Sequence, residues 1–187
     1  RGVKVIAISD VSGGLYCPDG LDIDAVSLFL EKKDALLKDY DAPGVSHISN
    51  EEILTCKCDV LVPAALENQI TEENAGTLNC TYIVEAANGP TTEEADEILE
   101  KRGITLIPDI FANSGGVIVS YFEWVQNIQE LTWDREQVNE MLEKLMSNSF
   151  RKLLEIVEEC HCTFRMAAYI LALRKLIIAE KMKGIFP

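Results

Sequence analysis

The residues best suited to chemistry lie in one stretch, which reads PDIFANSGGVIVSYFEW from Pro108 to Trp124. The apolar run ITLI before it is typical of a strand, and Pro108 would end that strand. Residues Asn113 to Gly116 predict a turn that tolerates positive φ angles and lets another molecule approach the backbone. From Val117 the spacing becomes helical. Free N–H groups at such a helix start favour the binding of a carboxylate or a phosphate. The alternative interpretation of this stretch is an ordinary glycine-containing loop with no ligand.

The predicted helix after this turn has an apolar side and two polar residues outside it. These polar residues are Ser120 and Glu123. The apolar side is formed at helical spacing by Val117, Tyr121, Trp124 and Val125.

Small or polar residues also follow three other predicted strands. Val3–Ser9 ends at Asp10, Asp59–Val62 is followed by Pro63, Ala64 and Ala65, and Tyr82–Val84 is followed by a loop that contains Asn88. An acidic residue at the end of the first strand, such as Asp10, can accept hydrogen bonds from a ribose diol. The alternative is that Asp10 is an ordinary turn aspartate. Ligands bind beyond the carboxyl ends of parallel strands. We therefore expect Asp10, Ala64, Ala65, Asn88 and Asn113 to line one crevice.

Strands and helices alternate along the first two thirds of the chain. Predicted helices over residues 24–38, from Asn50 and from Thr92 separate the strands, and Ser12-Gly13-Gly14 predicts a turn. This alternation predicts an α/β fold with a parallel sheet. After Trp124 the pattern is helical, with a capping box at Asp134 and Gln137 and a last helix from Thr163 or Phe164 to Lys183, which Gly184 would cap.

Composition excludes several functions. The chain has 187 residues, 48% of them hydrophobic and 26% charged, and a formal net charge of −14. Nucleic acids and anionic membranes bind basic surfaces, so neither is an expected partner. Arg174 and Lys175 interrupt the most apolar segment, which argues against a membrane span. The two CxC pairs lack the spacing of a zinc site, so we expect no metal and reduced thiols.

Three motifs resemble a known family. DVLVPAALENQI, EAANGPTTEEADEIL and PDIFANSGGVIVSYFEWVQNIQ are similar to the nucleotide-binding domain of hexameric glutamate dehydrogenases, above all to the bacterial, archaeal and plant group. The resemblance covers the whole chain. It implies a Rossmann-like, doubly wound, mostly parallel sheet that lacks its first β–α unit, over residues 1–125, followed by a C-terminal helical segment over residues 126–187.

The resemblance also implies an activity: the reversible oxidative deamination of L-glutamate to 2-oxoglutarate and ammonia, with a hydride passing to NAD or NADP. It assigns Asp10 to the adenosine ribose, Ala64 and Ala65 to a loop along the cofactor, Asn88 to the nicotinamide ribose and Asn113 to the nicotinamide end. Ser120 is similar to a serine that contacts the side-chain carboxylate of the substrate, and Val117 to a residue against its methylenes.

Parts of the family pattern lie outside this sequence. The GxGxxG fingerprint is expected just before Arg1, and the preceding substrate domain supplies the catalytic lysine and aspartate in this family. We therefore expect the chain to be a fragment of a homo-hexamer, to contain no catalytic residue of its own, and to be inactive when isolated. The cytoplasm is the expected location, or the mitochondrial matrix for a eukaryotic parent.

Two other functions are open from the sequence. One is a leucine, valine or phenylalanine dehydrogenase, which shares the fold, and Ser120 distinguishes it from a glutamate enzyme. The other is a non-catalytic binding or assembly module, which weak or absent NAD binding by the isolated chain would support. Asp10 would repel a 2′-phosphate, so NAD is favoured over NADP.

Overall fold

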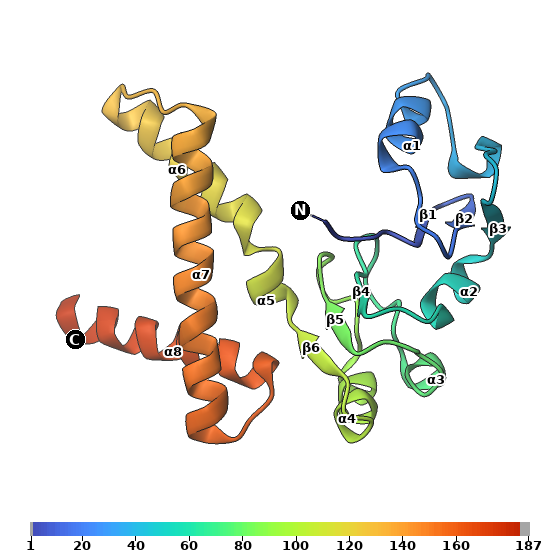
Figure 1. The fold of residues 1–187 in the computed structure, drawn as a ribbon. Helices are drawn as coiled ribbons and strands as arrows, with labels where there is room; N and C mark the ends of the chain where they lie inside the picture. Colours follow the sequence, from blue (N-terminus) through green and yellow to red (C-terminus); the bar gives the residue numbers. More distant parts are fainter. Residues whose placement is uncertain (1, 184–187) are drawn as a thin grey trace. The chain divides into compact units, whose positions relative to one another are not determined.

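The computed structural model describes residues 2–183, which form a mixed α/β structure (Figure 1). Its strands are β1 (Ala7–Asp10), β2 (Gly13–Tyr16), β3 (Ser46–Ile48), β4 (Val60–Leu61), β5 (Tyr82–Val84) and β6 (Thr105–Ile107). Its helices are α1 (Ile23–Leu30), the 3-10 turn η1 (Leu37–Asp39), α2 (Asn50–Thr55), α3 (Glu72–Ala75), α4 (Glu93–Lys101), α5 (Asp109–Ala112), α6 (Ser114–Gln129), α7 (Arg135–Cys160) and α8 (Phe164–Lys183). The α/β prediction is confirmed, and the predicted cap at Gly184 lies outside the described residues.

The chain divides into two compact units. The first contains residues up to 61 together with 73–81, and the second contains 62–72 and the residues from 82 onward. The domain boundary predicted between residues 125 and 126 stays a prediction.

The first unit is built on an antiparallel sheet with the strand order β1–β2–β3. Ile8 lies opposite Leu15, and Leu15 lies opposite His47. The first strand was predicted to belong to a parallel sheet, but β1 pairs with β2 in antiparallel orientation, so this prediction is wrong. The core of this unit is formed by Leu15, Cys17, Leu21, Val26, Leu37 and Tyr40.

The predicted turn at Ser12-Gly13-Gly14 is displaced by one to two residues. Val11 and Ser12 form the turn, and both glycines belong to β2. A Cβ on Gly14 would lie 3.0 Å from Ile48 Cγ1, so glycine at this position lets β3 approach β2 closely. Gly14 therefore serves strand packing, whereas Gly13, at φ +127, has a backbone conformation that favours glycine at the end of the turn.

The second sheet has the strand order β4–β5–β6, and β5 and β6 run parallel with Ile83 opposite Leu106. Helix α4 connects these two strands, as predicted. Thr92 caps it by accepting from the Ala95 amide at 3.3 Å. Gly103, at φ +72, follows the helix and leads into β6, because glycine adopts the left-handed conformation without strain.

The segment after β6 differs from its prediction. Pro108 does end β6, but it is also the N-cap of α5, since its fixed φ suits a helix start. Residues Ser114, Gly115 and Gly116 form the first turn of α6, and neither glycine has a positive φ. The predicted glycine turn is therefore wrong: α5 and α6 follow one another with only Asn113 between them.

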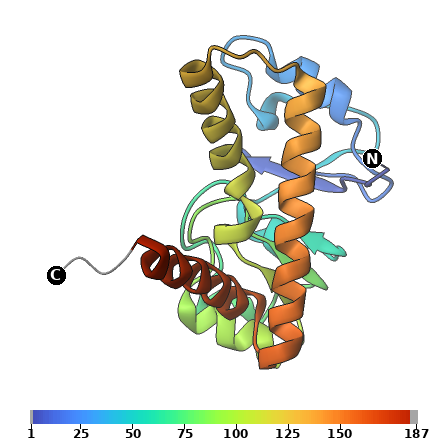
Figure 2. The ribbon, with the colours of Figure 1, turned by 90° about the vertical axis from the view of Figure 1, so that its left-hand side faces the viewer.

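Three long helices complete the second unit, and α8 runs at an angle to α7 from near the C-terminal end of α7 (Figure 2). The predicted capping box of α7 is confirmed, with Asp134 accepting from the Gln137 amide at 2.8 Å. Leu153, Ile156, Ala167 and Ala168 form the core between α7 and α8. The ring of Phe150 stacks on Phe164 with centroids 5.9 Å apart. None of the described helices combines the length and apolar content that crossing a membrane requires.

Candidate functional site

An open cleft of about 580 Å³ in the second unit brings most of the predicted site residues together. It is lined by the loop after β4, the loop after β5 and one side of the start of α6. The lining residues are Ala64, Ala65, Ala86, Ala87, Asn88, Asn113, Gly116, Val117 and Ser120. Six residues selected from the sequence thus share one cleft, and Asp10 belongs to the other unit.

Backbone hydrogen bonds hold two of these loops together. The Pro63 carbonyl accepts from the amides of Ala86 and Ala87, each at 3.0 Å. The Asn68 amide donates to the Gly89 carbonyl at 2.9 Å. These loops form an alanine-rich wall of the cleft, which consists of Ala64, Ala65, Ala86 and Ala87. The small side chains of this wall leave the backbone accessible, so a flat ring or a ribose can lie close to it.

Two asparagine side chains form the polar centre of the cleft. Asn113 Nδ2 donates to Asn88 Oδ1 at 2.6 Å and to the Ala87 carbonyl at 3.5 Å. Asn113 does not cap α6 with its side chain. Among the described residues, the Asn88 amide nitrogen and the Asn113 side-chain oxygen have no other partner. The amide NH2 group of Asn88 and the amide oxygen of Asn113 therefore remain for a ligand, a set that matches a carboxamide or a ribose diol.

Helix α6 presents the third wall. Gly116, Val117 and Ser120 lie on one side of it, because Ser120 is four residues after Gly116 and three residues after Val117. A Cβ on Gly116 would meet nothing within 4 Å, so any side chain there would enter open space beside the cleft. The Val117 side chain is 74% exposed, and the Ser120 hydroxyl has no partner among the described residues.

The apolar side predicted for this helix is not its buried side. Tyr121 and Trp124 are more than half exposed and stack on each other with ring centroids 5.8 Å apart. The buried residue of α6 is Phe122, whose ring meets Trp133 edge-on at 6.0 Å. Periodicity found the apolar residues, but it could not say which of them meet the rest of the unit.

Asp10 ends β1 as predicted, and its carboxylate is already hydrogen-bonded. Oδ1 accepts from the Ser12 amide at 2.7 Å and the Ser12 hydroxyl at 2.6 Å, and Oδ2 accepts from the Leu37 amide at 2.9 Å. Burial raises the pKa of Asp10, but the bonds from Ser12 and Leu37 outweigh it, so the pKa lies below its ordinary value. Three of about four acceptor positions are therefore in use, and binding a ribose diol would displace one bond.

Sequence reasoning missed a charged cluster that joins four elements: Glu85, Asp96, Asp109 and Arg165. Arg165 on α8 donates to both oxygens of Glu85, at 2.8 and 3.1 Å, and also pairs with Asp96 on α4. Its Nη1 lies 3.6 Å from Asp109 Oδ1. Burial lowers the pKa of Arg165, but the hydrogen bonds to Asp96 and Glu85 raise it by more, so the side chain stays charged.

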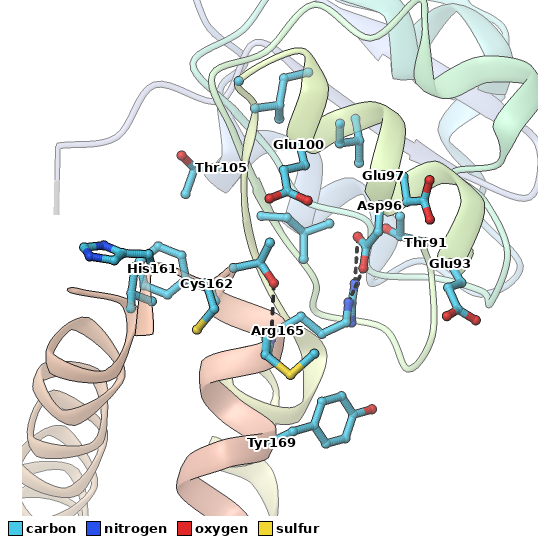
Figure 3. Close-up of a pocket in the computed structure, with 18 residues that line it drawn as sticks. Thr91, Glu93, Asp96, Glu97, Glu100, Thr105, His161, Cys162, Arg165 and Tyr169 are labelled. Carbon is cyan, nitrogen blue, oxygen red and sulfur yellow. Dashed lines mark hydrogen bonds and ion pairs between the residues drawn. The ribbon is translucent and has the colours of Figure 1, made fainter. Parts of the chain in front are cut away.

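A second cavity, of about 780 Å³, lies between α4 and the turn that joins α7 to α8 (Figure 3). Arg165 and Asp96 face each other across part of it, and His161 and Cys162 come from the turn. It contains none of the site residues predicted from the sequence. Burial raises the pKa of Cys162, which disfavours the thiolate. Within residues 2–183, no three His, Cys, Asp or Glu side chains are grouped to hold a metal ion.

Comparison with known proteins places the chain in a family. The sequence profile described as Glutamate/Leucine/Phenylalanine/Valine dehydrogenase matches residues 1–184. The chain belongs to this family. It is 47% identical over 186 residues to the glutamate dehydrogenase of Thermotoga maritima, covering 100% of this chain and 44% of that protein. It is 48% identical to the cryptic catabolic NAD-specific glutamate dehydrogenase of Bacillus subtilis, covering 98% of this chain and 42% of that protein.

Solved structures agree with this family membership. The hetero-hexameric glutamate dehydrogenase of Thermus thermophilus, in a Leu-bound form, matches with a TM-score of 0.87 at 31% identity, over 100% of this chain and 43% of that one. The glutamate dehydrogenase of Peptoniphilus asaccharolyticus matches with a TM-score of 0.80 at 36% identity, over 99% of this chain and 42% of that one. The chain thus spans less than half the length of these relatives. The family resemblance is confirmed, whereas the roles of individual site residues stay predictions.

Proposed function

We propose that this chain forms the nicotinamide side of the cofactor site, and one wall of the substrate site, in a glutamate dehydrogenase. The reaction is the oxidative deamination of L-glutamate to 2-oxoglutarate and ammonia, and NAD, when bound, accepts the hydride. The observation that carries the proposal is the cleft in which Ala64, Ala65, Asn88, Asn113 and Ser120 meet. Two curated relatives at 47 and 48% identity that are named glutamate dehydrogenases support the substrate.

The residues of the cleft fit the nicotinamide nucleotide. The alanine-rich wall admits a flat ring, and Gly116 leaves space where a side chain would project. The remaining amide donor of Asn88 and the remaining oxygen of Asn113 complement the carboxamide and the ribose hydroxyls of the cofactor. These groups orient the cofactor, and they do not themselves transfer a proton.

Ser120 and Val117 are proposed to contact the substrate. The Ser120 hydroxyl can donate to the side-chain carboxylate of glutamate, and Val117, less than one turn earlier on α6, can pack against its methylenes. The catalytic lysine and aspartate are proposed to come from a preceding domain of the parent protein, which we propose to be a cytoplasmic homo-hexamer. The isolated chain is then inactive.

NAD is proposed as the preferred cofactor. The Asp10 carboxylate is charged at neutral pH, where its pKa lies well below the solution pH, and that charge repels the 2′-phosphate of NADP. A relative named as NAD-specific supports the same preference.

Replacing Ser120 tests the substrate assignment. In the full-length enzyme, Ser120→Ala removes one hydrogen bond to a charged group and should weaken glutamate binding by about 1–3 kcal/mol, seen as a raised KM. Steady-state kinetics with glutamate measure this change. Norvaline is the control substrate because it lacks the side-chain carboxylate of glutamate, so its KM should not change. An unaltered KM for glutamate would remove Ser120 from the substrate site and favour a leucine, valine or phenylalanine dehydrogenase.

A further inference from the structure

The charged cluster of Glu85, Asp96, Asp109 and Arg165 is connected to two walls of the cleft through Glu85 and Asp109. Glu85 is the residue after β5 and precedes Ala86, Ala87 and Asn88 in sequence. Its side chain is 0% exposed. A fully buried carboxylate is costly unless it is paired and hydrogen-bonded, and Arg165 meets it with a two-pronged contact. The guanidinium therefore fixes the point from which the Asn88 loop departs.

Asp109 connects this point to the start of α5. Its amide donates to Glu85 Oε2 at 2.8 Å, and its own Oδ2 accepts from the Gly89 amide at 2.8 Å. Glu85 and Gly89, at the two ends of the loop that contains Asn88, are therefore both hydrogen-bonded to Asp109. Asp109 lies four residues before Asn113, so the same bonds set the position of Asn113 relative to Asn88.

We propose that Arg165 is a positioning residue for the cofactor cleft: by holding Glu85 and Asp109, it fixes the spacing of the Asn88 and Asn113 side chains. Arg165 lies on α8, 69 residues or more from Asp96 and Glu85 along the chain. It does not line the cleft and is not proposed to touch the cofactor. This inference rests on the proposed function, because the cleft it organises is the proposed nicotinamide site.

Arg165→Lys in the full-length enzyme tests the proposal. Lysine keeps the positive charge but cannot make the two-pronged contact with Glu85. We expect the dissociation constant for NADH to rise about tenfold, equivalent to about 1.4 kcal/mol. The dissociation constant for ADP-ribose, which lacks the nicotinamide, should stay unchanged. Hydrogen exchange at the Gly89 and Asp109 amides should become faster.

Arg174→Lys is the matched control. Arg174 lies on the same helix and makes a two-pronged contact with Glu159, but both side chains are about half exposed. We expect this variant to bind NADH and ADP-ribose as the wild type does. If Arg165→Lys does not fold, Asp109→Asn replaces it, because Asp109 is partly exposed and asparagine keeps one acceptor for Gly89.

The possible results separate this inference from the proposed function. Unchanged exchange at Gly89 and Asp109 in the Arg165 variant would overturn the positioning role, whatever the enzyme binds. Faster exchange with an unchanged constant for NADH, or equal losses for NADH and ADP-ribose, would also overturn it. If the wild type fails to bind NADH at all, the proposed function fails, and the exchange data still decide whether Arg165 orders the loop.

Discussion

At the scale of single residues, the cleft depends on what is small as much as on what is polar. Gly115 and Gly116 are adjacent in α6, but only Gly116 lines the cleft. A Cβ on Gly115 would meet Leu142 Cδ1 at 3.8 Å, which is ordinary contact, and a Cβ on Gly116 would meet nothing. The two positions therefore form a matched pair for testing the cleft.

Gly116→Ala should separate stability from cofactor binding. Alanine favours a helix over glycine by roughly 0.5–1 kcal/mol, so the variant should melt at the same or a higher temperature. Its methyl group should weaken NADH binding by about 1–3 kcal/mol through overlap with the ligand. Thermal melts and NADH titrations of the full-length enzyme measure both effects. Gly115→Ala is the control, and equal affinities in the two variants would show that the ligand does not approach Gly116.

Asp10 gives a second prediction at this scale, on pH. A carboxylate whose pKa is lowered by folding stabilises the protein above its unfolded pKa, and this contribution disappears as the pH falls through the folded pKa. Asp10→Asn should therefore cost about 1–2 kcal/mol at neutral pH. Hydrogen exchange at the Leu37 amide, in variant and wild type, measures the loss of protection. The difference should persist from pH 7 to about pH 5. A difference that vanishes within that range would contradict the lowered pKa.

At the scale of elements, the sequence predicted best where a local signal decides the structure. Strand β5 has the predicted bounds because its β-branched residues are flanked by polar loops, and α4 begins one residue after Thr92, the predicted start of that helix. Pro108 ends β6 as predicted, but its second role as the N-cap of α5 was missed, and Gly115-Gly116 was wrongly predicted to be a turn. Proline and glycine each occur in more than one local structure. Both are compatible with the first turn of a helix, and only the surrounding structure decides.

Contacts between distant elements were beyond prediction from the sequence. The Arg165–Glu85 pair joins residues 80 positions apart, and no spacing rule relates them. The antiparallel partner of β1 was missed for a related reason, since an alternating α/β pattern favours parallel pairing and Gly13-Gly14 resembled a turn. The sequence did indicate several candidate site residues. Asp10, Asn88 and Asn113 each follow a predicted strand, and Ser120 is a polar residue on a predicted helix.

At the scale of the whole molecule, this chain represents less than half the length of its relatives. The second unit contains the cleft and the charged cluster connected to it, and the first unit contains Asp10. The family includes enzymes for glutamate, leucine, phenylalanine and valine. The central claim is therefore a choice of substrate within a family that is already established.

The most direct test is the specificity of the full-length enzyme with NAD. We predict that kcat/KM for L-glutamate exceeds that for leucine, valine and phenylalanine by at least about 100-fold, because the Ser120 hydroxyl can hydrogen-bond to the side-chain carboxylate of glutamate and the other three side chains have no polar atom. Initial rates of NADH formation with each amino acid measure this ratio. A higher kcat/KM for leucine, valine or phenylalanine than for glutamate would contradict the account.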